Sequence, residues 1–568
     1  MLENGLRERL HCRLPTRPIP MEEILQLDAN DNVLVALSDL PRGRRLRHHD
    51  HDYLLSSDVP AKHKFAAKDF APDDAIIMYG VLVGRTREAV HAGQLLTTRN
   101  TRHDAREFHP HSGEFHWSPP DASRWRQATF NGFHRSDGQV GTRNYWLVIP
   151  LVFCENRNIL ALKQAFEEEL GFVAPSVYRR QVAELVRLYR EGAEDEIRSH
   201  PIGESSKKPA DSRVFENVDG IKFLIHQGGC GGTREDSASL CGLLAGYIHH
   251  PNVAGATVLS LGCQHAQVAL LRDQILKRNP NFDKPLVIFE QQQTGSEFHM
   301  LSQAVAATFS GLMEANRQAR RPAPLSNLCV GLKCGGSDGF SGISANPSIG
   351  HTADLLAALG GRTILSEFPE LCGVEQELID RCVSSDVGDR FIHLMRDYAA
   401  RAKAVGSGFD WNPSPGNIRD GLLTDAMKSA GAAKKGGTSP VTDVLDYPDY
   451  STRPGLNLQC TPGSDVECVT AQVGAGANIV LFTTGLGTPT GNPIAPVVKI
   501  STNSVLSKRM SDIIDIDTGK VISGERGIAE TGEAILDQVA RFASGEQRTK
   551  AELLGQDDFI PWKRGVSL

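Results

Sequence analysis

Short runs of apolar residues, most of them ended by glycine or a polar residue, recur through the larger part of this chain. They occupy residues 145–150, 221–225, 256–261, 285–290, 328–332, 362–367, 478–485 and 497–500. Apolar runs of four to eight residues between turn signals are typical of buried β-strands, and helical patterns separate them here. Strands that alternate with helices favour a parallel sheet covered by helices on both faces. The larger part of the chain is therefore predicted to be an α/β body.

The first hundred residues follow a different pattern. Apolar runs at 33–37, 59–66 and 76–84 are short, and turn residues recur every ten or so positions, which is typical of a small all-β module. A polar stretch rich in histidine and proline follows without periodicity and is predicted to be a linker. We therefore expect four segments, which are a β domain at 28–103, a linker at 104–129, a first α/β domain at 130–322 and a second at 323–568.

Composition and charge narrow the class of protein. The 568 residues are 40% hydrophobic and 23% charged, as in a globular protein of several domains. The net charge of −7 comes without a basic stripe, so we expect no nucleic-acid partner. The sequence contains neither an apolar run of membrane-spanning length nor a secretory signal, so we expect no membrane partner and a cytoplasmic location. The 11 cysteines are irregularly spaced, which argues against a disulfide framework.

Three cysteines, Cys230, Cys263 and Cys334, each lie where an apolar run gives way to glycine. Ligands of open α/β sheets bind beyond the carboxyl ends of the strands, so three thiols at such ends are predicted to converge on one crevice. Soft thiolates bind Zn²⁺, Fe²⁺ or iron–sulfur clusters. The alternative for each is a small residue packed under a glycine turn, which is also our expectation for the other cysteines, Cys154 among them.

Acidic residues occupy similar positions. Glu290 and Glu367 end predicted strands, while Asp338 and Asp465 lie in glycine-containing loops. Carboxylates placed in this way can ligate a metal, orient a hydroxyl group or accept a proton. The alternative is a helix N-cap or a loop carboxylate in solvent.

Cationic residues become important if the substrate is an acid. Arg143 and Asn144 directly precede one predicted strand, and Lys499 lies in another. An arginine can bind a carboxylate through two parallel hydrogen bonds. The alternative for each of these residues is an exposed group at the edge of a strand.

Several motifs together identify a family. They include FHRSDGQVGTRNYW (133–146), PLVFCENRN (150–158), GCGGTR (229–234), GGSDGFSG (335–342), NPSPGN (412–417) and PGSD (462–465). They resemble the altronate/galactarate dehydratase family, and the similarity runs from about residue 28 to beyond 510. The resemblance implies that the β module is a SAF-type, β-clip-like domain. It also implies that the α/β body is a dehydratase in two parts, closer to the altronate branch.

The resemblance further implies that water is removed from a sugar acid to give a 2-keto-3-deoxy acid, with Fe²⁺ or Mn²⁺ as the metal. Abstraction of the weakly acidic C2 proton needs a base and cationic stabilisation, and loss of the C3 hydroxyl needs an acid. The residues expected to hold the metal, or an iron–sulfur cluster in its place, are Cys230, Cys263 and Cys334. Arg143 and Asn144 are expected to bind the substrate carboxylate. Lys499, His63 or Lys64 is expected to move protons. The residues expected to bind hydroxyls or water are Asp338, Glu290, Glu367 and Asp465.

Other readings of the sequence stay open. The same body could act on galactarate or on another hydroxy acid such as sulfolactate. A thiol-ligated iron–sulfur redox or sensor protein and a non-catalytic sugar-acid-binding protein are the alternatives of a different class. The expected partner is a small-molecule sugar acid, and the sequence leaves open whether the chain forms a homo-oligomer.

Overall fold

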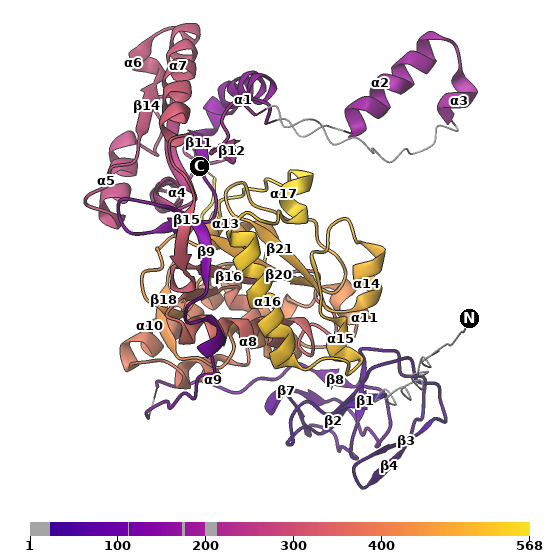
Figure 1. Ribbon diagram of the computed structural model, residues 1–568. Helices are drawn as coiled ribbons and strands as arrows, with labels where there is room; N and C mark the ends of the chain where they lie inside the picture. The colour runs from indigo at the N-terminus through magenta and orange to yellow at the C-terminus, as the bar shows by residue number, and fades with distance from the viewer. Residues whose placement is uncertain (1–22, 112, 173–176, 199–212, 568) are drawn as a thin grey trace, which may run out of the picture.

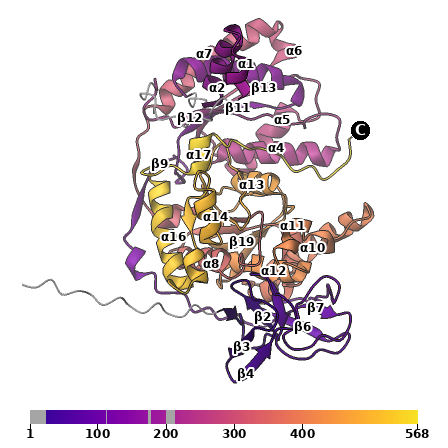
Figure 2. The ribbon, with the colours of Figure 1, turned by 90° about the vertical axis from the view of Figure 1, so that its right-hand side faces the viewer.

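The structure is a computed structural model that describes residues 23–111, 113–172, 177–198 and 213–567. Figures 1 and 2 show three parts stacked one above the other. A small strand-rich domain lies at one end, a domain built on a seven-stranded sheet lies in the middle, and a domain built on a four-stranded sheet lies at the other end. The predicted class, a small β module followed by a parallel-sheet α/β body, is confirmed.

The N-terminal domain contains only strands and turns, and all of its strand pairs are antiparallel. The run at 76–84 is a hairpin rather than one strand, because the chain turns at Tyr79 and Gly80, which both have positive φ. The strands are β1 (Ile24–Leu25), β2 (Val33–Ala36), β3 (Arg45–His48), β4 (His51–Leu54), β5 (Lys64–Ala66), β6 (Ala75–Met78), β7 (Val81–Thr86) and β8 (Thr101–Arg102).

The predicted linker has little regular structure beyond the short helix η1 (Ser123–Trp125). It leads into β9 (Thr129–His134), which pairs antiparallel with β10 (Val140–Gly141) and with β15 (Arg321–Pro324). This small sheet lies where the chain passes between the two α/β domains (Figure 1).

The second domain is a parallel sheet in the order β12-β11-β13-β14. Its strands are β11 (Tyr145–Pro150), β12 (Gly220–Phe223), β13 (Val253–Ser260) and β14 (Leu286–Glu290). Its helices are η2 (Phe153–Glu155), α1 (Asn156–Leu170), α2 (Val177–Arg190), α3 (Glu194–Arg198), α4 (Arg234–His249), α5 (Val268–Arg278), α6 (Gln291–Thr294) and α7 (Glu297–Ala315). Helices α2 and α3 project away from the rest of the domain (Figure 1).

The third domain is a parallel sheet in the order β18-β19-β17-β16-β20-β21-β22. Its strands are β16 (Cys329–Cys334), β17 (Arg362–Leu365), β18 (Val441–Leu445), β19 (Gly455–Gln459), β20 (Ile479–Thr484), β21 (Val497–Ser501) and β22 (Ile516–Asp517). Its helices are η3 (Leu325–Asn327), α8 (Ala345–Ala358), η4 (Phe368–Leu371), α9 (Glu375–Asp380), α10 (Ser385–Ala404), η5 (Phe409–Trp411), α11 (Pro415–Arg419), α12 (Asp425–Ala433), η6 (Lys434–Gly436), α13 (Asp465–Gly474), α14 (Ser504–Arg509), α15 (Gly519–Ile522), α16 (Ile528–Ala543) and α17 (Lys550–Leu554). Each of the eight apolar runs that the sequence predicted as strands overlaps a strand of the two parallel sheets. None of the helices in the described ranges is long and apolar enough to cross a membrane.

The two α/β domains meet along a buried seam. Helices α4 and α13 pack so closely that a Cβ added at Gly246 would lie 2.1 Å from the carbonyl oxygen of Gly474. Polar side chains also cross the seam, because Thr142 Oγ1 donates to the carbonyl oxygen of Asn478 at 2.7 Å and Asn252 Nδ2 donates to that of Ile494 at 2.7 Å. Buried polar groups need such partners to offset the loss of water. The seam therefore fixes the two sheets relative to each other.

Candidate active site

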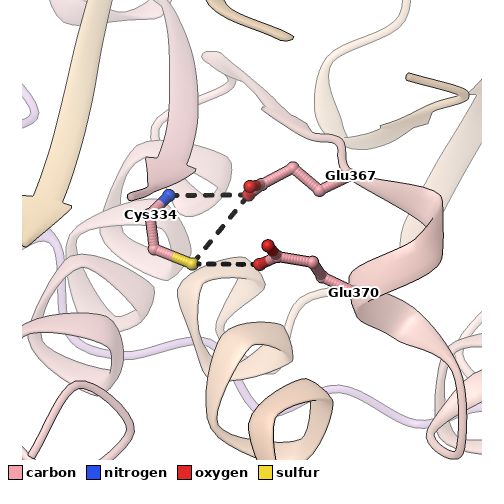
Figure 3. A group of neighbouring side chains, drawn as sticks. All are labelled: Cys334, Glu367 and Glu370. Atoms are coloured by element: carbon pink, nitrogen blue, oxygen red, sulfur yellow. Dashed lines mark hydrogen bonds between the residues drawn. The ribbon is translucent and has the colours of Figure 1, made fainter. Parts of the chain in front are cut away.

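A buried group of Cys334, Glu367 and Glu370 lies at the carboxyl edge of the seven-stranded sheet (Figure 3). Cys334 is the last residue of β16, and the two glutamates follow the neighbouring parallel strand β17. The sulfur of Cys334 lies 3.4 Å from Oε2 of Glu370 and 4.0 Å from Oε2 of Glu367. Parallel neighbours end at the same edge of a sheet, and this brings the three residues together.

The backbone of Glu367 has an unusual conformation. Its φ of +70° lies in the left-handed region, which costs a residue with a Cβ roughly 1–2 kcal/mol. Its amide donates to the Thr461 hydroxyl at 3.0 Å, and its carbonyl accepts from the Glu370 amide at 2.7 Å. These bonds hold a tight turn from which both carboxylates point toward Cys334 (Figure 3). Strained residues of this kind concentrate at functional sites.

Three lysines surround the group. Lys435, in η6, places its nitrogen 2.7 Å from the Cys334 sulfur and 2.6 Å from Oε2 of Glu367. Lys428, in α12, donates to Oε1 of Glu370 at 2.8 Å.

The third lysine, Lys333, completes the charge balance. It forms ion pairs with Glu367 and, at 3.0 Å, with Oδ1 of Asp465 at the start of α13. Three ammonium groups therefore face three carboxylates, and each charge that burial would otherwise penalise has a partner.

Burial and these charges shift the pKa values of the two glutamates in opposite directions. Burial raises the pKa of Glu367, and the neighbouring charge of Glu370 adds to this rise. Burial also opposes ionisation of Glu370, but Lys428 and the other lysines outweigh it and lower its pKa to about 2. Burial raises the pKa of the Cys334 thiol to about 12, against the effect of Lys435. Two coupled carboxylates with pKa values pushed apart are typical of acid–base pairs in enzymes.

The cluster does not fit the predicted role of Cys334 as a metal ligand. One thiolate and two carboxylates alone would suit Fe²⁺ or Mn²⁺. However, the Lys435 ammonium group already contacts the same sulfur of Cys334 and the same oxygen of Glu367 that a metal would need. Because the lysines already balance the carboxylates, we derive no metal-dependent step from this cluster.

A second polar group joins the β domain to the third domain. Lys62 lies 3.1 Å from Oδ2 of Asp338 and 2.8 Å from Oδ1 of Asp420, and Thr502 Oγ1 donates to Asp338 at 3.1 Å. The buried Lys64 donates to the carbonyl oxygen of Gly421 at 2.7 Å. Lys64, predicted to move protons, and Asp338, predicted to bind hydroxyls or water, are thus brought to one region, and Lys62 was not foreseen.

The predicted proton-transfer groups differ in environment. Burial lowers the pKa of Lys64 to about 7 and that of Lys499 to about 8, and it also lowers the pKa of His63. The Lys499 nitrogen contacts the carbonyl oxygen of Thr490 and lies 3.3 Å from Oε1 of Gln556. Lys64 is therefore the amine whose pKa lies nearest to neutrality.

Arg143 and Asn144 bind protein groups in this structure. The Arg143 guanidinium forms two parallel bonds to Glu552, at 2.6 and 3.0 Å, and a third to the carbonyl oxygen of Phe542 at 2.9 Å. The Asn144 amide nitrogen donates to the carbonyl oxygens of Asn217 and Ala315. Both side chains are buried, at 2% and 0% exposure. This geometry argues against the predicted carboxylate clamp, because the donors are already used.

Cys230, Cys263 and Cys334 do not follow strands of one sheet, which removes the premise on which their convergence was predicted. Cys230 follows β12 and Cys263 follows β13 in the four-stranded sheet, where Glu290 ends β14, whereas Cys334 ends β16 in the seven-stranded sheet. Within the described ranges, Cys334, Glu367 and Glu370 form the group of three or more potential metal-ligating residues whose ligand atoms all lie within 4.8 Å of one another.

Sequence reasoning missed most of the cationic side of the cluster. Glu370 lies three residues beyond the predicted Glu367, and Lys333 directly precedes Cys334. Lys428 and Lys435 come from segments about a hundred residues away, and no local pattern connects them to β16. The available signal was the lysine- and glycine-rich stretch at 431–437.

Comparison with known proteins places nearly the whole chain in one family. Family models match residues 22–104 (Altronate/galactarate dehydratase SAF domain), 132–316 (D-galactarate dehydratase/Altronate hydrolase, second domain) and 325–567 (D-galactarate/Altronate dehydratase, C-terminal). The chain is 33% identical to an altronate dehydratase of Bacillus subtilis and 32% identical to one of Escherichia coli. Each match covers 96% of this chain and 100% of the relative.

The chain belongs to the altronate/galactarate dehydratase family. A galactarate dehydratase (L-threo-forming) of Escherichia coli is 28% identical over 93% of this chain and 92% of its own length. The predicted enzyme class, a hydro-lyase that dehydrates a sugar acid, is confirmed at this level. The predicted SAF-type module and the two parts of the α/β body correspond to the three segments that the family models match.

Proposed function

We propose that this chain is an altronate dehydratase, which converts altronate to 2-keto-3-deoxygluconate and water. The observation that carries the proposal is the end-to-end similarity to two altronate dehydratases, at 33% and 32% identity, against 28% for the galactarate enzyme. The substrate is then a small sugar acid with a carboxylate at C1 and hydroxyls at C2 and C3.

The chemistry requires opposite charges held close together. Removal of the C2 proton builds negative charge on the C1 carboxylate, and nearby fixed cations lower the cost of that charge. The three lysines around Cys334 supply such cations, although Lys333 and Lys435 are fully buried. Asp465, whose side chain is 29% exposed, is the member of the cluster that faces outward and is placed to bind a substrate hydroxyl.

Within the proposal, the two glutamates divide the proton transfers. Glu370 is ionised near neutral pH and is assigned as the proton acceptor, whereas burial raises the pKa of Glu367, which makes Glu367 the better of the two as proton donor to the departing C3 hydroxyl. Lys64 is a second candidate base, because its pKa of about 7 leaves a large neutral fraction at neutral pH. The closeness of both glutamates to the Cys334 sulfur, which keeps a proton acceptor and a proton donor in one cluster, supports the first assignment.

The test is an anaerobic assay of the purified full chain, supplied with Fe²⁺, on altronate and on galactarate, with 2-keto acid as the readout. We expect product from altronate, and we expect Glu370→Gln to lower kcat by about 10²–10⁴-fold. The exposed Glu530→Gln is the matched control and should keep wild-type turnover. Product from galactarate alone would show that galactarate, and not altronate, is the substrate. A lack of 2-keto acid from both sugar acids would overturn the proposal.

A further inference from the structure

Exposure divides the cysteines of the described ranges into two sets. Six of the ten are buried and Cys372 is half-buried, whereas Cys154, Cys230 and Cys263 are exposed. The exposed three follow β11, β12 and β13, which are adjacent in the sheet order β12-β11-β13. Because these strands are parallel, the three thiols lie on loops at one edge of the four-stranded sheet.

Backbone contacts tie these three loops to one another. The amide of Phe153, next to Cys154, donates to the carbonyl oxygen of Gly228 at 3.1 Å, and the amide of Ala266 donates to that of Gly229 at 3.0 Å. Gly229 has a φ of +100°, and a Cβ there would lie 2.4 Å from the carbonyl oxygen of Leu151. The loop of Cys230 is therefore packed directly against the segment that carries Cys154.

Two buried side chains fix the shape of the loops. His226 Nε2 lies 2.8 Å from the carbonyl oxygen of Pro150, and the amide of Gly228 donates to its Nδ1 at 3.1 Å. Gln264 accepts from the amide of Gly262 at 2.7 Å and donates to the hydroxyl of Ser260 at 2.6 Å. Each thiol-bearing loop is thus held by hydrogen bonds, as in a preorganised ligand site.

The donor type favours a soft metal or an iron–sulfur cluster, and the lack of a close three-sulfur group among the described residues argues against a single ion. Thiolates favour soft metals and iron–sulfur clusters. Two thiolates on one tetrahedral zinc, each at ~2.3 Å, lie about 3.8 Å apart, but these three sulfurs do not form a group within 4.8 Å. A cluster binds each thiolate through a different iron atom, so its ligands stand further apart than those of a single ion.

We propose that Cys154, Cys230 and Cys263 together bind an iron–sulfur cluster at this edge of the four-stranded sheet. Three protein thiolates leave one iron atom of a four-iron cluster without a protein ligand. A cavity of about 570 Å³ opens beside Cys230 and is lined also by Asp236 and Lys563. A small molecule can therefore reach the site. This proposal concerns cofactor binding and does not depend on the substrate proposed above.

The test measures iron and acid-labile sulfide per chain after anaerobic reconstitution of the full-length protein with Fe²⁺ and sulfide. The variants are Cys154→Ser, Cys230→Ser and Cys263→Ser. Cys382→Ala, a buried cysteine of the third domain, is the matched control, and Cys334→Ala tests the buried cluster. We expect equal iron and sulfide in the wild type and both controls, and at least a fivefold loss of both in each of the three serine variants.

Far-ultraviolet circular dichroism and the melting temperature show whether each variant is folded, and the isosteric serine keeps the loop packing. Iron without labile sulfide in the wild type, or a folded Cys154→Ser variant with wild-type iron and sulfide, would overturn the proposal. Loss of the cluster in Cys334→Ala would also overturn it. None of these readouts involves turnover, so failure of the cluster is distinguishable from failure of the dehydratase assay.

Discussion

The ammonium nitrogen of Lys435 lies 2.7 Å from the sulfur of Cys334. The same nitrogen is 2.6 Å from Glu367, so a single lysine bridges the thiol and the carboxyl group at the edge of the central sheet. In this arrangement a fixed side-chain cation lies between the thiol and the carboxyl group. Its removal leaves a buried carboxylate short of a partner.

We therefore expect Lys435→Met to destabilise the protein by about 3–5 kcal/mol, the usual cost of breaking a buried ion pair. Lys434→Met is the matched control, because Lys434 is adjacent, only half-buried and stacked over the Tyr79 ring. Urea denaturation, followed by circular dichroism, measures the free energy of unfolding of both variants. Equal losses for the two variants would contradict the bridging role of Lys435.

Arg143 and Glu552 are expected to act in stability and not in substrate binding. The two side chains are buried and joined by two parallel bonds, so Arg143→Lys and Glu552→Gln should lower the melting temperature by similar amounts. Neither should change KM for the sugar acid more than about threefold. A large rise in KM for Arg143→Lys alone would restore the carboxylate clamp that the sequence predicted.

Lys64 should make stability depend on pH. Burial lowers its pKa from 10.5 to about 7, so between these values the unfolded chain binds more protons than the folded chain. The loss of stability that comes from burying the charged Lys64 side chain is full below pH 7 and disappears as the pH rises toward 10.5. The melting-temperature difference, Lys64→Met minus wild type, should therefore be most positive near pH 6.5 and should fall with rising pH. For the exposed control Lys68→Met, the difference should not vary with pH.

The ion pairs of Lys62 should hold the β domain against the third domain. Lys62→Met removes both bonds, to Asp338 and to Asp420, and should speed proteolysis within the linker at 104–129, which has little regular structure. Lys68→Met again serves as the control. An unchanged cleavage rate in Lys62→Met would show that the other contacts, the bond from Lys64 to Gly421 among them, are enough to hold the domain.

Local pattern predicted the sheets well, because buried strands carry their signal in the sequence itself. The run at 328–332 became β16 with Cys334 at its end, whereas Glu367 lies two residues beyond the end of β17. Local pattern could not tell which sheet each strand joins. Cys334 was therefore grouped with Cys230 and Cys263, although its nearest partners come from β17 and η6.

Exposure was also beyond the reach of sequence reasoning. Cys154 follows the strand at 145–150, as Cys230 and Cys263 follow theirs, but it has no glycine beside it and was taken for a small buried residue. Only the strand order β12-β11-β13 shows that its loop lies between the other two. The partner of Arg143 was missed for a related reason, since Glu552 lies about four hundred residues further along the chain.

The seam between the α/β domains has a consequence for how such a protein can be divided. Thr142, Asn252 and Asn478 are almost completely buried and find their partners on the opposite side of the seam. A fragment that carried only one domain would expose these polar side chains, and the glycine faces of α4 and α13, to water. We therefore expect the second and third domains to fold only when they are expressed together, and a chain truncated between them to aggregate.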